Sequence, residues 1–258
     1  RLAVGIRADW LLDLVPGGLS ESEETAWNPS TERVETIRQL RYGAVILDET
    51  RQAAAPSPET SRILAQAVLS AEGDDDGISG GSTARLRVKL ELLREAFPDQ
   101  GIPSLAAEKV RDTVLAACAG LTSMADFRAM PLEERLRQAL PLQVLGLLRN
   151  ETPDHIRLPG GRQVPVGYEP GKPPWIESRL QDFFGMQTGP AICRGRLPLT
   201  LHLLAPNQRA VQVTSDLAGF WRRHYPDIRR ELSRRYPRHA WPEDGATAKP
   251  PVPRPPRR

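Results

Sequence analysis

Residues 197–221 read LPLTLHLLAPNQRAVQVTSDLAGFW and predict a strand, a turn, a second strand and the start of a helix. Leucines stand at every second position from Leu197 to Leu203, which is the period of a half-buried β-strand. Ala205-Pro206-Asn207 predicts a turn, and residues 210–214 return as the second strand. Ser215 or Asp216 can cap the helix that follows. The stretch therefore indicates an α+β fold.

Working outward from this stretch, we expect a small α+β domain over residues 151–242. Residues 155–158 and 163–168 flank Pro159-Gly160-Gly161, which predicts a β-hairpin. Pro226 begins a further helical stretch that reaches Tyr236. A short helix is predicted after Pro173-Pro174 from apolar residues on one side, namely Trp175, Ile176, Leu180, Phe183 and Phe184.

The earlier part of the chain changes character twice. Alternation around residues 33–42, followed by Gly43 and the apolar run 44–47, predicts two or three antiparallel strands. We assign residues 1–55 to the end of a β-domain. Apolar residues at helical spacing make 56–150 a mostly helical segment, which begins with Ser57 as N-cap. Residues 243–258 are rich in Pro and Arg, offer little to bury, and are predicted to be disordered.

The bulk composition is that of a globular protein, with 40% hydrophobic and 26% charged residues. No apolar run reaches the roughly 18–20 residues that span a bilayer, so we expect no membrane span. Cys118 and Cys193 stand far apart without further metal ligands, which predicts buried thiols and a cytoplasmic location. Because the first residue is Arg1, we expect a fragment of a longer protein.

The net charge of +3 hides an asymmetry. Residues 194–258 hold fourteen Lys and Arg against five Asp and Glu, whereas residues 1–193 hold 21 against 27. Arginine pairs recur between residues 222 and 235 with aromatic residues among them, a pattern that suits phosphates and unpaired bases. Two alternatives stay open: a plain amphipathic helix with solvated arginines, and docking on an acidic protein surface. The predicted nucleic-acid-binding residues are Arg222, Arg223, Arg229, Arg230, Arg234, Arg235, Tyr236 and Trp241.

No catalytic site can be assembled from the sequence. Residues 44–49, AVILDE, imitate the Mg²⁺-binding strand of an ATPase, but no P-loop precedes them. Gly171-Lys172 is followed by Pro173, where a P-loop needs a hydroxyl. Asp74-Asp75-Asp76 lacks the alternating ligands of a calcium loop. The four histidines are scattered, so we expect no metal site and no cofactor in this chain.

Several long strings resemble the C-terminal region of bacterial HrpB-type DEAH-box ATP-dependent helicases. They are the quoted residues 197–221, the segment RRYPRHAWPED at 234–244, and the pair formed by PPW at 173–175 and QDFFG at 181–185. Residues 4–12 and 40–49 resemble the stretch after the helicase core of that family. The similarity is weaker between residues 58 and 150.

This resemblance implies a role rather than an activity. Residues 1–55 would be the end of an oligonucleotide-binding-like (OB-like) β-domain, and the rest a family-specific C-terminal region. Upstream helicase domains of the same polypeptide would bind ATP and Mg²⁺, and the nucleic acid would be RNA rather than DNA. We therefore expect an accessory portion that supports nucleic-acid binding or braces the helicase core. The alternative is a protein-interaction scaffold that docks through the basic helix and Pro-rich tail.

Overall fold

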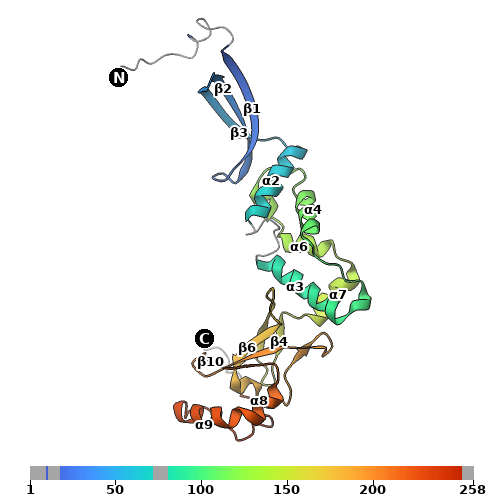
Figure 1. Ribbon diagram of the computed structural model, residues 1–258, viewed down its shortest axis with the longest axis vertical. Coiled ribbons are helices and arrows are strands. Elements are labelled where there is room, and N and C mark those ends of the chain that lie inside the picture. The colour runs from blue at the N-terminus through green and yellow to red at the C-terminus, as the bar shows by residue number, and fades with distance from the viewer. Residues whose placement is uncertain (1–9, 11–17, 72–80, 252–258) are drawn as a thin grey trace, which may run out of the picture. The chain divides into compact units, whose positions relative to one another are not determined.

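The computed structural model describes residues 10, 18–71 and 81–251 (Figure 1). The chain divides into two compact units, one of residues 1–83 and 105–139 and the other of residues 84–104 and 140–258. The helical residues are shared between these two units, and the predicted domain boundaries stay a prediction. Among the described residues, no helix has the length and apolar content needed to cross a membrane.

The first unit begins with a three-stranded antiparallel sheet in the order β1-β2-β3 (Figure 1). The turn between the first two strands is held by Glu35, which accepts hydrogen bonds from Asn28 Nδ2 and Thr31 Oγ1, both at 2.8 Å. These bonds, Asn28 first, lower the pKa of the Glu35 carboxyl. The OB-like assignment of this sheet stays a prediction. The strands are β1 (Leu19–Asn28), β2 (Arg33–Tyr42) and β3 (Val45–Ala53).

Four helices complete the described part of the first unit. The predicted cap at Ser57 is confirmed, because its Oγ accepts the Thr60 N–H at 3.0 Å. The start of β2 is tied to the helices, since Val34 N donates to Thr122 O at 2.9 Å and Met124 N to Glu32 O at 3.0 Å. The helices are α2 (Pro58–Ala71), α4 (Ala107–Ala117), α5 (Met124–Arg128) and α6 (Leu132–Gln138). Their buried residues include Leu64, Val68, Val110, Val114, Phe127 and Leu136.

The second unit is built on a five-stranded sheet in the order β10-β9-β6-β5-β4. The pairs are antiparallel except β6 with β9, which run parallel. The predicted hairpin at 155–168 is present, and the one predicted at 197–214 is present from Thr200, because residues 197–198 pair with β7 in a separate sheet. The strands are β4 (His155–Arg157), β5 (Gln163–Gly167), β6 (Trp175–Arg179), β9 (Thr200–Leu204) and β10 (Ala210–Thr214), with a small hairpin of β7 (Ala191–Ile192) and β8 (Leu197–Pro198).

Helices from two parts of the chain join this sheet. α3 (Gly81–Ala96), which lies mostly in this unit, is bound through Lys89 Nζ to Asp154 Oδ1 at 2.6 Å and through Arg85 Nη2 to Val166 O at 3.1 Å. α3 is followed by the short 3₁₀ helix η1 (Pro98–Gln100). α7 (Leu142–Glu151) is joined to the unit by a hydrogen bond of 3.0 Å that Cys193 N donates to Glu151 O. α8 (Leu217–Arg223) and α9 (Tyr225–Arg235) follow the last strand (Figure 1).

Two predictions about this unit are wrong. The short helix expected over residues 175–184 is instead strand β6 followed by the 3₁₀ turn η2 (Leu180–Phe183). Ile176 and Ser178 alternate into the core, and the buried Asp182 accepts the Ser178 hydroxyl at 2.7 Å. The predicted disorder of 243–258 also fails for residues 243–251, where Gly245 is buried and its carbonyl accepts the Gly185 N–H at 3.0 Å. The rest of that segment lies outside the described residues.

Candidate nucleic-acid interface

The basic end of the chain is carried by α8 and α9, whose starts are fixed by local chemistry. Asp216 caps α8, because its Oδ1 accepts the Gly219 N–H at 2.7 Å. This bond and the Arg223 guanidinium at 2.8 Å lower the pKa of the Asp216 carboxyl. Pro226 stands in the first turn of α9, where its missing N–H costs no helical hydrogen bond.

An aromatic cluster lies beneath the two helices. Phe184, Phe220, Trp221 and Tyr225 are buried, and neighbouring ring centroids stand 5.0–6.3 Å apart. Burial raises the pKa of the Tyr225 hydroxyl to about 12. That hydroxyl donates to Pro242 O at 2.8 Å. The apolar side of α9 is therefore anchored, and its arginines other than Arg229 are exposed.

Residues 236–251, which we call the C-terminal strap, fold back over this cluster. Trp241 Nε1 donates to Tyr236 O at 3.0 Å, and Arg229 Nε donates to Trp241 O at 2.9 Å. Arg229 also lies 3.7 Å from Glu243. A Cβ on Gly245 would come within 2.5 Å of the Trp221 ring, so the strap backbone packs directly on the indole.

The structure sorts the predicted contact residues into two groups. Arg229, Tyr236 and Trp241 are half-buried, and Arg229 and Trp241 spend their polar atoms on the strap. Arg229 Nε and Trp241 Nε1 already donate to backbone carbonyls, and contact of these two residues with nucleic acid stays a prediction. The exposed group consists of Arg222, Arg223, Arg230, Arg234 and Arg235.

The exposed arginines differ in their neighbours. Arg223 pairs with Asp216, and Arg230 pairs with Asp227. Arg235 lies over the Tyr236 ring, with the guanidinium carbon 5.7 Å from the ring centroid. Neither Arg222 nor Arg234 has an ion pair among the described residues. Exposed ion pairs are worth little, roughly 0–1 kcal/mol, so phosphates can replace them.

An open hollow of about 540 Å³ lies along α9 between these arginines. It is lined by Arg230, Arg234 and Arg235, together with Asp227 and Glu231. Three guanidinium groups converge on one surface within two helical turns, which is the arrangement that tracks a phosphate backbone. The two carboxylates keep docking on a mixed-charge protein surface open as the alternative.

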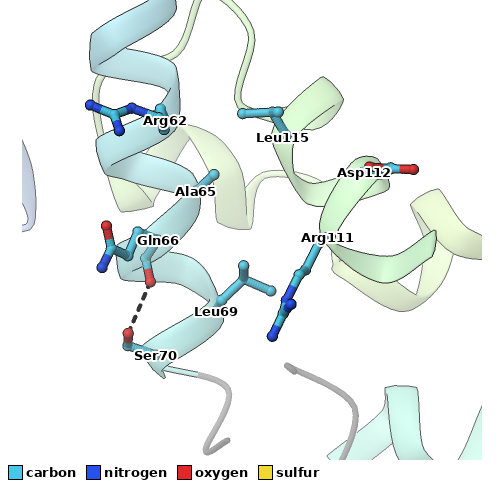
Figure 2. A pocket seen from close by; sticks show the side chains of 8 residues that line it. All are labelled: Arg62, Ala65, Gln66, Leu69, Ser70, Arg111, Asp112 and Leu115. Carbon is cyan, nitrogen blue, oxygen red and sulfur yellow. Dashed lines mark hydrogen bonds between the residues drawn. The ribbon is translucent and has the colours of Figure 1, made fainter. Parts of the chain in front are cut away.

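A second hollow of about 350 Å³ lies between α2 and α4 of the first unit. Figure 2 shows Leu69 and Leu115 turned towards the space between the helices, with Ala65 beside them, while Arg62 points away from it. The arginines of its lining do not converge, so this hollow lacks the charge pattern of a phosphate site.

An ATP site does not fit the residues described. Asp48 and Glu49 lie within the exposed strand β3, and Glu49 is bound to Gln39 Nε2 at 2.6 Å and Arg51 Nε at 2.8 Å. Those bonds, that from Arg51 first, lower the pKa of the Glu49 carboxyl. No group of three His, Cys, Asp or Glu side chains suited to a metal occurs in the described part of the chain.

Sequence reasoning missed one aromatic pair. Trp175 of β6 and His202 of β9 stack with their ring centroids 4.9 Å apart and their planes 18° apart. The pair could not be predicted from a helix over residues 175–184, because a helix would not place Trp175 in a strand beside β9. The alternation of Trp175 with Ile176, and of His202 with Leu201 and Leu203, was the available signal.

With this geometry in place, the comparisons with known proteins decide the family. Residues 114–245 match the family described as ATP-dependent helicase C-terminal, HrpB_C. This chain belongs to that HrpB family. It is 29% identical over 257 residues to the ATP-dependent RNA helicase HrpB of Escherichia coli K12, a match that covers 96% of this chain but 31% of that protein.

Two solved HrpB structures resemble the present fold. The E. coli DExH-box NTPase HrpB gives a TM-score of 0.68 at 26% identity, over 96% of this chain and 31% of the other. The E. coli DEAH/RHA helicase HrpB gives 0.59 at 26% identity, over 90% and 30%. The chain thus corresponds to the C-terminal region of HrpB-type ATP-dependent helicases and spans less than a third of their length.

Proposed function

We propose that this HrpB-type C-terminal region is an accessory module that grips single-stranded nucleic acid through α9, with RNA preferred over DNA. The observation that carries the proposal is the set of outward arginines on α9, held in place by the aromatic cluster and the C-terminal strap. The similar E. coli protein is named as an RNA helicase, which supports the choice of RNA.

In this proposal the ATP chemistry belongs to other parts of a longer helicase. Helicase domains of the same polypeptide would bind ATP and Mg²⁺, and this region would hold or orient the strand for them, or brace them. A cytoplasmic location remains a prediction that rests on the two free cysteines.

The test is a fluorescence-anisotropy titration of the chain with a labelled ten-nucleotide uridine RNA at several salt concentrations. We expect log Kd to rise linearly with log salt, because phosphate contacts release counterions. Changing Arg230, Arg234 and Arg235 to Ser together should weaken binding and reduce the salt slope by about 2, at roughly 0.7 per lost contact.

The matched control changes Arg38, Arg87 and Arg128 to Ser, which removes the same charge from other exposed helices and strands. It should leave the salt slope unchanged. Equal losses in both variants would mean that only net charge matters. No binding by the unaltered chain at low salt would reject the proposal and favour α9 as a protein-docking surface.

A further inference from the structure

In the five-stranded sheet of the second unit, one face is covered, and the opposite face is open around the middle of β6, β9 and β10. Directly paired strand residues share a face, and the pairs Ile176–Leu201 and Ser178–Leu203 are buried. The alternate pair Glu177–His202 therefore points to the opposite face, together with Val213, which pairs with His202 from β10. On this open face Glu177 and Val213 are each about half exposed, and the His202 side chain is 31% exposed.

The centre of the open face is built around an aromatic stack. Trp175 lies between Gly167 of β5 and His202 of β9, because β6 stands between those two strands. A Cβ on Gly167 would come within 2.2 Å of the indole, so only glycine leaves room for this ring. The imidazole packs parallel to the indole, 4.9 Å away, and Val213 lies beside it. The stack is thus prearranged, and part of the His202 side chain stays exposed beside it.

One end of this face carries positive charge that suits a phosphate chain, whereas Glu177 Oε2 lies at the centre, 3.9 Å from His202 Nδ1. Register places Arg157, which pairs with Gln163 of β5, at the end of the sheet where β6 finishes. Arg209, in the turn between β9 and β10, lies at the same end. Both arginines are exposed and have no ion pair among the described residues. Two strand positions separate His202 from Leu204 at that end, about 7 Å of strand length.

We propose that this open face is a second nucleic-acid contact, at which one unpaired base stacks on His202 while Arg157 and Arg209 hold neighbouring phosphates. The inference deepens the proposed function and rests on it, since it names where bases rather than phosphates are read. An apolar protein segment suits this face less well, because Gln163, Glu177 and Arg157 are exposed on it. Stacking accepts any base, since every base has a π-face.

The experiment compares His202→Ala with His202→Phe in the intact chain. The probes are a ten-nucleotide uridine RNA and an abasic oligonucleotide of the same length. His202→Ala should raise the Kd for the RNA by about tenfold, the effect of losing one stacked base. His202→Phe, which keeps a ring, should bind the RNA nearly as the unaltered chain does. The abasic probe should bind all three proteins equally.

The matched control is Leu142→Ala, on a side chain that is 86% exposed in α7. Thermal unfolding of each variant shows whether the fold is kept. Salt-dependent RNA binding that is the same in His202→Ala and the unaltered chain would overturn this inference while the α9 proposal stands. If the variant with Arg230, Arg234 and Arg235 changed to Ser binds RNA more weakly while His202→Ala binds it normally, the inference about His202 is likewise wrong and the α9 proposal stands. If the unaltered chain binds no RNA, the proposed function fails, and this inference with it.

Discussion

Gly167 shows how one missing side chain shapes the second unit. Its Cβ position is occupied by the Trp175 indole, so Gly167→Ala forces the ring or the strand to move. We expect this change to lower the free energy of unfolding by about 1–3 kcal/mol, the usual cost of overpacking. Gly146 is the matched control, because a Cβ there meets nothing within 4 Å inside α7.

Gly146→Ala should instead stabilise the protein by about 0.5–1 kcal/mol through helix propensity. Urea denaturation of the two variants measures both effects. If the two substitutions shifted the midpoint in the same direction, the packing of Trp175 on Gly167 would be refuted.

The two cysteines predict a dependence of stability on pH. Burial raises the pKa of the Cys118 and Cys193 thiols to about 11, from the ordinary value of 9.0. Unfolded thiols lose their protons first, so the free energy of unfolding is unaffected below pH 9 and falls as the pH rises towards 11. Most of the fall between pH 9 and pH 10 comes from the thiols, because unfolded tyrosines, with an ordinary pKa of about 10, ionise later.

Denaturant midpoints measured across this window should decline in the unaltered chain and decline less in the Cys118→Ala, Cys193→Ala double variant. The native thiols should also react slowly with a disulfide reagent at neutral pH, since the thiolate is the reactive form. Fast labelling of the folded chain would contradict their burial.

At the scale of elements, strict periodicity was predictable and irregular packing was not. Leucines at alternate positions indicated β9, and Ser215-Asp216 indicated the start of α8, where the structure selects Asp216 as the cap. The prediction of a helix over residues 175–184 was wrong because the segment is short. A five-residue strand and a 3₁₀ turn offer too few positions to distinguish the period of a strand from that of a helix. The prediction of disorder was wrong for the strap because composition does not reveal its hydrogen bonds. Its backbone carbonyls accept hydrogen bonds from distant side chains.

The C-terminal strap is expected to be an integral part of the second unit. A chain that ends at Arg238 loses the hydrogen bonds from Tyr225 to Pro242, from Arg229 to Trp241 and from Trp241 to Tyr236. At about 1 kcal/mol for each bond, the free energy of unfolding should fall by about 3 kcal/mol or more.

Circular dichroism melts of this truncation measure the loss, and a chain that ends at Pro251 serves as the control because it keeps these contacts. If both chains melted at the same temperature, the strap would contribute nothing to the fold.

At the scale of the whole molecule, the sequence indicated the fold class and the basic end but not the division into units. Helices α3 and α7 belong with the five-stranded sheet through Lys89, Arg85 and Glu151, each of which bonds to a residue far away in the sequence. Such long-range pairs leave no local pattern, so boundaries drawn where composition changes assigned the helices between residues 56 and 150 to one segment. The internal bonds of Arg229 and Trp241 were equally invisible in the sequence, since their partners are backbone carbonyls.

Residues 44–49 imitate the Mg²⁺-binding strand of an ATPase, yet we expect the whole chain to lack ATPase activity. An ATPase needs a P-loop and a free acidic pair on Mg²⁺, whereas the sequence has no P-loop and Glu49 is bound to Gln39 and Arg51. The purified chain should therefore release no phosphate from ATP above the rate in buffer, with or without RNA. An Asp48→Asn, Glu49→Gln variant should behave identically in a phosphate-release assay and bind the uridine RNA equally well. RNA-dependent ATP hydrolysis that disappeared in this variant would place catalysis in β3. It would contradict the proposal that ATP is hydrolysed by other parts of a longer helicase.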